Sequence, residues 1–211
     1  MKRAQFGIIQ MERSRFTLGS SVNKKRVCIK PSAVAVWVCF AIFEPTVYTM
    51  LLFLVMALHE CGHLLALKLC GVRDVRIILS GFGAEIYYHT MVNGTANRAM
   101  IALGGVFLNL LTGAVFLCWR QNMLCLYISV ASFVLAFLNL LPIKGLDGGK
   151  ALEEILTCYA DADTVYTVMR FLSIFCVVLL GVLSVCVLMV NEFNFSLLLF
   201  TLYLSLSLFR L

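Results

Sequence analysis

An almost uninterrupted apolar segment, Leu51–Gly71, contains His59, Glu60 and His63. Ionisable side chains within a membrane-spanning segment are costly unless they are paired or functional. On a helix, the two histidines lie one turn apart on the same face, so both rings can reach one ion. Glu60 can approach the same point without binding it. This H-E-x-x-H pattern is typical of helices in which two histidines hold zinc and the glutamate acts as a base. The segment therefore predicts a zinc site inside a membrane.

The composition excludes a water-soluble fold. Hydrophobic residues make up 62% of the 211 residues and charged residues 13%, against about 25% charged in soluble domains. The nine cysteines lie mostly in apolar runs and form no C-x-x-C pair. We therefore expect reduced, buried cysteines and neither a disulfide framework nor a zinc ribbon.

The positive charge is concentrated at the N-terminus. Residues 1–30 hold eight Lys/Arg and one acidic residue, a net +7, which leaves −1 for the rest of the net +6. This distribution predicts a basic cytoplasmic arm beside a membrane, with Met11 as an alternative first residue, and no nucleic-acid-binding face.

Apolar runs predict an all-α polytopic membrane protein with six transmembrane helices and a small β-hairpin between the second and third. A full span needs about 20 residues. The first run is short for this and has a re-entrant or interfacial helix as its alternative; the last is near the lower limit. The expected spans are residues 31–45, 46–67, 99–119, 123–143, 170–190 and 193–209.

The Lys and Arg residues predict the orientation. With both termini in the cytoplasm, sixteen of the seventeen basic residues fall on the cytoplasmic side, and only Arg120 lies outside. Cytoplasmic loops are enriched in these residues. His59 then lies about 20 Å along the second span from Thr46, at 1.5 Å per residue. The zinc site is thus expected in the cytoplasmic half of the membrane.

Residues 72–89 predict the hairpin. Arg76–Leu79 and Ala84–Tyr88 resemble short strands joined by the turn Ser80–Gly83. So small a hairpin is expected to pack on the membrane domain. Its edge could accept an extended peptide as an added strand, and a plain connector is the alternative.

A catalytic zinc site usually has three protein ligands, and Asp147 is the candidate for the third. The fourth span runs in the same direction as the second, so Asp147 is expected level with the histidines. Pro142 and Gly145 interrupt the helix before it, and irregular backbone at membrane depth normally lines a cavity or is buried in protein. A helix N-cap is the alternative role for Asp147. Asn139 could bind backbone freed by the break, or a substrate strand.

Three motifs together resemble those of the site-2 proteases, which are intramembrane zinc metalloproteases. They are H-E-C-G-H at 59–63, G-G-V-F-L-N at 104–109 and N-L-L-P-I-K-G-L-D-G-G at 139–149. The last string, extended by Lys150, is most similar to the subgroup of the stage IV sporulation protein FB. The resemblance covers roughly residues 30–211, without the CBS domain usual in that subgroup or the PDZ domain of other members.

The resemblance implies one zinc ion per chain, held by His59, His63 and Asp147, with Glu60 as the catalytic base. It places Asn139, Gly105, Asn109 and Gly83 among the substrate-binding or supporting positions, although packing of small residues explains Gly105 and Asn109 equally well. The implied substrate is a membrane-associated protein, such as a pro-sigma factor in sporulation. The implied setting is a bacterial cell membrane, with regulatory membrane proteins as further partners.

Three other functions fit the H-E-x-x-H motif less well. A zinc transporter needs polar residues lining a path to both faces, and the outer half has almost none. A prenyl-protein endopeptidase needs a further histidine, and none follows His89. A catalytically inactive scaffold would have no need of Glu60.

Overall fold

The computed structural model describes residues 27–29, 46–72, 75–80, 83–88, 92, 94–190 and 196–210. The expected first span, His89 and all of the N-terminal arm except residues 27–29 lie outside these ranges. The elements are β1 (Val27–Ile29), α2 (Thr46–Leu69), β2 (Val75–Ser80), β3 (Gly83–Tyr88), α3 (Thr95–Leu117), α4 (Met123–Leu140), α5 (Asp147–Leu156), α6 (Ala162–Val190) and α7 (Ser196–Arg210).

Among the residues that the structure describes, four helices are long and apolar enough to cross a membrane, and the chain is therefore a membrane protein. Helix α7, with 15 residues, extends about 22 Å, which is less than the roughly 30 Å of a bilayer core. The four helical stretches are Val47–Leu69, Thr95–Leu117, Met123–Leu140 and Ala162–Met189.

Two of these helices begin earlier than expected. Helix α3 begins at Thr95, where the apolar pattern suggested residue 99, and α6 begins at Ala162, where it suggested residue 170. Hydropathy marks the part of a helix that suits lipid, whereas the backbone hydrogen bonds continue through polar residues such as Arg98 and Asp163. The helices therefore extend beyond their apolar segments.

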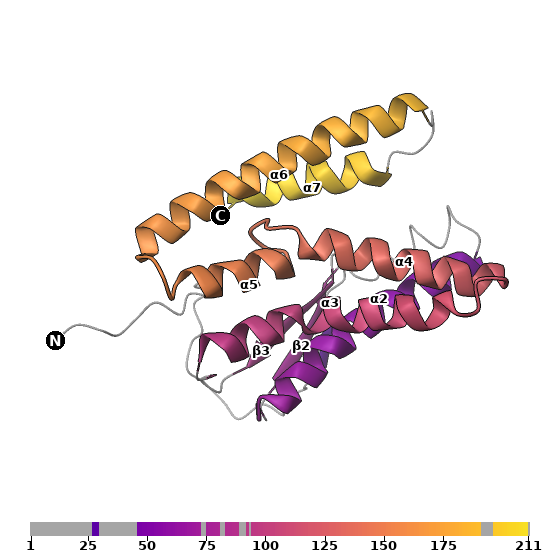
Figure 1. Cartoon of the computed structure of the whole chain (residues 1–211), viewed down its shortest axis with the longest axis horizontal. Helices are drawn as coiled ribbons and strands as arrows, with labels where there is room; N and C mark the ends of the chain where they lie inside the picture. The colour runs from indigo at the N-terminus through magenta and orange to yellow at the C-terminus, as the bar shows by residue number, and fades with distance from the viewer. Residues whose placement is uncertain are drawn as a thin grey trace.

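Glycines allow α2 and α3 to pack with their backbones in contact. A β-carbon on Gly104 would lie 2.6 Å from the carbonyl oxygen of Gly62, and one on Gly62 would overlap the carbonyl of Gly104. Small residues at such a crossing permit the close approach typical of membrane helices. The contact brings the α2 histidines against α3, which also packs on α4 and α5 (Figure 1).

Local sequence signals end α2 and α4. Gly71 has a φ of +75°, its N–H donates to the carbonyl of Lys68, and the N–H of Val72 donates to that of Leu67, which together form a Schellman cap. Helix α4 ends at Leu140 because Pro142 lacks an N–H and disfavours helical geometry in the residue before it.

The three strands form one sheet in the order β1-β2-β3. Strands β2 and β3 pair antiparallel, from Val75 with Tyr88 to Ser80 with Gly83, so Gly83 is the first residue of β3. Strand β1 pairs with β2 in parallel, with Val27 opposite Ile77. Strand β1 was not anticipated from the sequence; it lies in the predicted arm and makes β2 the central strand.

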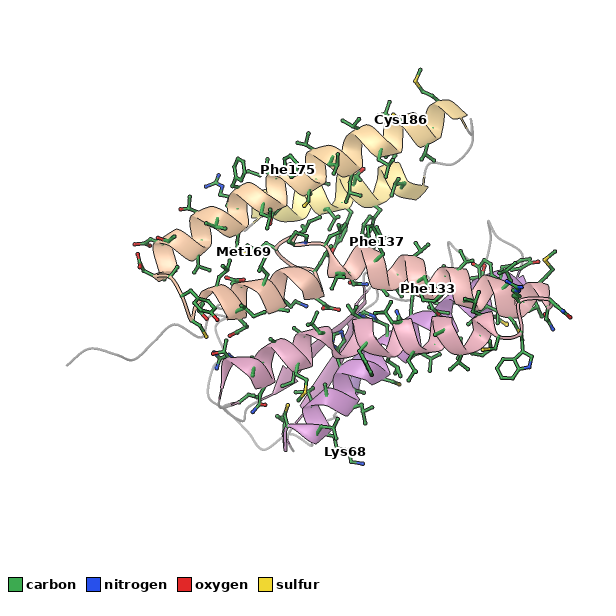
Figure 2. All side chains as sticks on the ribbon, viewed as in Figure 1. Lys68, Phe133, Phe137, Met169, Phe175 and Cys186 are labelled. Atoms are coloured by element: carbon green, nitrogen blue, oxygen red, sulfur yellow. The ribbon has the colours of Figure 1, made fainter. Side chains whose placement is uncertain are left out.

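Helices α6 and α7 lie side by side and contact the rest of the fold around the α4–α5 connection (Figure 1). Ile143, within that connection, is fully buried with Leu180 of α6 and Leu204 of α7. Figure 2 shows Met169, which is also fully buried, on the side of α6 that faces α5, and the exposed Phe175 on the opposite side. The α4–α5 connection is thus fixed between the two helix groups.

Candidate metal centre

Helix α2 supplies the two histidines. His59 and His63 are 7% and 8% exposed, and their rings lie edge to face with centroids 4.9 Å apart. Glu60, between them in sequence, is half-buried. The i, i+4 spacing thus brings both rings to one point, as the motif predicts.

The turn between α4 and α5 delivers Asp147 to the same point. Two glycines let the chain fold back tightly, because β-carbons on Gly148 and Gly149 would overlap the carbonyls of Leu140 and Ile143. Asp147 is the first residue of α5 and is 5% exposed. The N-cap position belongs to Leu146, and no side chain caps the helix. The alternative N-cap role for Asp147 is therefore not observed.

Three side-chain atoms converge in this buried space. Oδ2 of Asp147 lies 3.0 Å from Nε2 of His59 and 3.0 Å from Nε2 of His63, and the two nitrogens are 3.3 Å apart. Within the part of the chain described, these three residues form the one cluster of His, Cys, Asp and Glu side chains with metal-ligand spacing.

The hydrogen bond of His63 to the backbone fixes its tautomer. Nδ1 of His63 lies 2.8 Å from the carbonyl oxygen of Ile101. Because a carbonyl only accepts, Nδ1 carries the hydrogen, and Nε2 of the neutral ring presents a lone pair. That lone pair faces the carboxylate oxygen of Asp147. A cation among the three atoms would convert this repulsion into attraction.

The donor set fits a zinc ion. Imidazole nitrogen and carboxylate oxygen are ordinary zinc ligands, and tetrahedral coordination at roughly 2.0–2.1 Å separates ligand atoms by about 3.3 Å. The observed separations of 3.0 to 3.3 Å are close to this value. Three protein ligands also leave the fourth position for water or substrate, the arrangement of catalytic zinc sites.

Asp147 presents its two carboxylate oxygens to different partners, and the positive charge of Lys150 beside it favours the ionised form. Nζ of Lys150 lies 3.2 Å from Oδ1. One carboxylate oxygen thus faces Lys150 and the other faces the histidines.

Of the four supporting positions that the sequence suggested, the structure places two against the histidines and two in other contacts. Gly105 lies against both histidines, where a β-carbon would come within 2.7 Å of Nε2 of His59. Asn109 also reaches the site, with Nδ2 3.1 Å from Nδ1 of His59. Asn139 instead donates to the carbonyl of Leu135 in its own helix, and Gly83 belongs to the sheet.

Two contributors were not identified from the sequence. The Ile101 carbonyl has no sequence signature, since any residue supplies the same group. Lys150 had a detectable signal, because it follows Asp147 by three residues and so lies on the same face of α5. Lys150 entered only as part of the motif at residues 139–150, without a role of its own.

This fold and site define a helical membrane protein with a buried His–His–Asp centre, and the fold has a known counterpart. The chain is similar to the solved structure of a site-2 protease from Methanocaldococcus jannaschii, with a TM-score of 0.64 and 20% sequence identity. The similarity covers 87% of this chain and 89% of that one. At this identity it establishes a shared fold. No protein-family model matches the sequence, and no curated protein matches it.

Proposed function

We propose that this protein is an intramembrane zinc metalloprotease of the site-2 type that cleaves a membrane-associated protein. One observation carries the proposal: two histidines of a membrane helix and an aspartate far away in sequence converge their ligand atoms within 3.3 Å of one another, and Glu60 directly follows the first histidine in sequence. The fold shared with a site-2 protease supports it independently.

The residues divide into those that hold the ion and one that moves protons. His59, His63 and Asp147 would hold one zinc ion, which when bound makes water more acidic and stabilises negative charge on a carbonyl oxygen. Glu60 would take the proton from the attacking water and return it to the leaving amine. It is suited to this role because it directly follows His59 in sequence and is half-buried.

The charge pattern supports a cytoplasmic position for the site. We infer six spans with both termini in the cytoplasm, because this arrangement leaves only Arg120 among the basic residues on the outer side. The site would then lie in the cytoplasmic half of a bacterial cell membrane, and the attacking water would have to reach it there. A transmembrane substrate helix would have to unwind there to present its peptide bond.

The sheet offers a way to hold an unwound substrate. Strand β2 has neighbours on both sides, whereas β3 has one neighbour among the described strands. We therefore propose that the edge of β3 pairs with the substrate as an added strand. The resemblance of residues 139–150 to the sporulation subgroup favours a pro-sigma factor as this substrate, and other membrane proteins as its regulators.

The test is replacement of Glu60 by Gln in full-length protein with a membrane reporter substrate. Cleavage should fall by at least about a hundredfold, the usual contribution of a positioned base, while zinc content stays the same. Cys61→Ala is the matched control, because Cys61 is exposed on the same helix turn. The Cys61→Ala variant should cleave the reporter normally. Unchanged cleavage by the Gln variant would reject the mechanism. Comparing membrane proteomes of cells with either form would identify the substrate.

A further inference from the structure

We propose that Asn109 is a positioning residue whose side-chain oxygen holds His59 in the tautomer that can bind the ion. This inference rests on the metal site proposed above and adds a role for a residue that is not itself a ligand. The observation behind it is the placement of the fully buried Asn109 amide on α3 within 3.1 Å of Nδ1 of His59.

The two histidines face the same chemical requirement. Each presents Nε2 to the centre, and a ring nitrogen that binds a metal cannot also carry a hydrogen. The hydrogen must then be on Nδ1, where a partner has to accept it. For His63 that partner is the Ile101 carbonyl, 2.8 Å away. For His59 the group at Nδ1 is the Asn109 amide.

The amide can face His59 in either of two orientations, because its oxygen and nitrogen have nearly the same shape. If Nδ2 donates to Nδ1, the neutral His59 ring carries its hydrogen on Nε2, pointing at Asp147, and cannot bind an ion there. If the amide is turned, Oδ1 accepts the hydrogen of Nδ1, and Nε2 is free for the ion. Binding of an ion therefore selects the second orientation.

The fully buried amide of Asn109 can satisfy one of its two ends at a time. With Nδ2 towards the ring, Oδ1 is buried without a hydrogen-bond partner, an arrangement that normally costs free energy. Turning the amide gives that oxygen the Nδ1 hydrogen of His59 as its donor and moves Nδ2 to the position without a partner, so the bound ion decides between the two orientations. Both histidines would then donate through Nδ1 to a neutral oxygen, a contact that orients the ring and makes Nε2 a better ligand.

Two substitutions at position 109 separate this role from packing. Asn109→Leu has a similar shape and no hydrogen bond, whereas Asn109→Asp keeps an oxygen acceptor and cannot donate when ionised. Thr112→Val is the matched control: Thr112 is buried on the same helix, and its hydroxyl donates to the carbonyl of Leu108 in that helix. His63→Ala identifies the zinc that belongs to the site.

The experiment measures zinc affinity of the purified full-length chain in detergent by competition with a chromogenic chelator. The absorption spectrum of the cobalt-loaded protein serves as a second readout of ligand geometry. Asn109→Leu should bind zinc about 10- to 100-fold more weakly, the usual effect of removing such a partner, with an altered cobalt spectrum. Asn109→Asp and Thr112→Val should bind at least as tightly as the unmodified chain.

The outcomes distinguish this inference from the proposal beneath it. The role of Asn109 is supported if Asn109→Leu binds zinc at the site more weakly and Asn109→Asp and Thr112→Val do not. The inference would be overturned, with the metal site intact, if Asn109→Leu bound zinc as tightly as the unmodified chain. It would also be overturned if Asn109→Asp or Thr112→Val weakened zinc binding as much as Asn109→Leu does. If the unmodified chain binds no zinc that His63→Ala removes, the metal site itself is rejected, and the inference with it.

Discussion

A β-carbon on Gly105 would lie 2.6 Å from Nε2 of His63, closer than real β-carbons approach other atoms. The same carbon would lie 2.7 Å from Nε2 of His59. The lack of a side chain at Gly105 of helix α3 therefore leaves room for the two candidate ligand nitrogens to meet. The backbone of α3 approaches α2 closely enough that only a hydrogen fits there.

This relationship predicts that Gly105→Ala will impair metal binding. The added methyl group must displace the histidine rings or separate the helices, and either change disturbs the ligand set. We expect zinc affinity to fall at least about tenfold, as for other changes beside metal ligands. Gly181→Ala on α6 is the control, since a β-carbon there meets nothing within 4 Å. Unaltered affinity in Gly105→Ala, measured by chelator competition, would contradict the placement of α3.

A second prediction concerns the turn that delivers Asp147. In Gly148→Ala the new β-carbon would overlap the carbonyl of Leu140, so the turn must open. Overpacking of this kind costs about 1–3 kcal/mol, and here it should also weaken zinc binding because Asp147 moves.

Gly71→Ala provides the comparison for the turn. Gly71 has a φ of +75° and nothing within 4 Å of an added β-carbon, so the variant carries backbone strain of about 1 kcal/mol far from the ligands. Thermal unfolding in detergent should show both variants destabilised, and only Gly148→Ala should lose zinc affinity. Normal zinc binding by that variant would show that the turn does not position Asp147.

The third prediction isolates the charge of Asp147. Asp147→Asn keeps the shape but replaces a carboxylate by a neutral amide, which is a poor zinc ligand. At a zinc concentration 100 times the dissociation constant, binding stabilises the unmodified fold by about 2.7 kcal/mol. The variant should show less than half of this stabilisation in the same melting experiment. Glu153→Gln makes the same charge change on α5 and should retain the full zinc effect. A full effect in Asp147→Asn would exclude it as a ligand.

The sequence predicted those parts of the site that depend on local periodicity and on helix direction. The i, i+4 spacing places His59 beside His63 whatever the rest of the chain does. Because the second and fourth spans are expected to run in the same direction, Asp147 was expected at the level of the two histidines. Contacts set by the crossing of α2 and α3 were less accessible: the Ile101 carbonyl is a backbone group, and helix packing explained Asn109 equally well.

The same distinction applies to the fold. Hydropathy located the four long helices, because lipid imposes an apolar surface along the span. It could not locate helix ends that continue past that surface, as at Ala162. Strand β1 is three residues long and pairs in parallel with a strand nearly fifty residues away. So short a strand carries no pattern of its own, and its position depends on the sheet that it joins.

The last prediction concerns the ion pair between α3 and α5. Nε of Arg98 lies 2.6 Å from Oε2 of Glu154, and the side chains are 33% and 25% exposed. The pair joins the first turn of α3 to α5, two turns from Asp147.

A double-mutant cycle with Arg98→Met and Glu154→Gln should give a coupling free energy of about 0.5–1 kcal/mol that decreases at high salt. Arg98→Met should be the more destabilising single change, because Arg98 also donates to the carbonyl of Val92. Zinc affinity should stay the same in all three variants, since neither side chain touches the ligands. Additive effects on thermal unfolding would show that the ion pair does not stabilise the packing of α5 on α3.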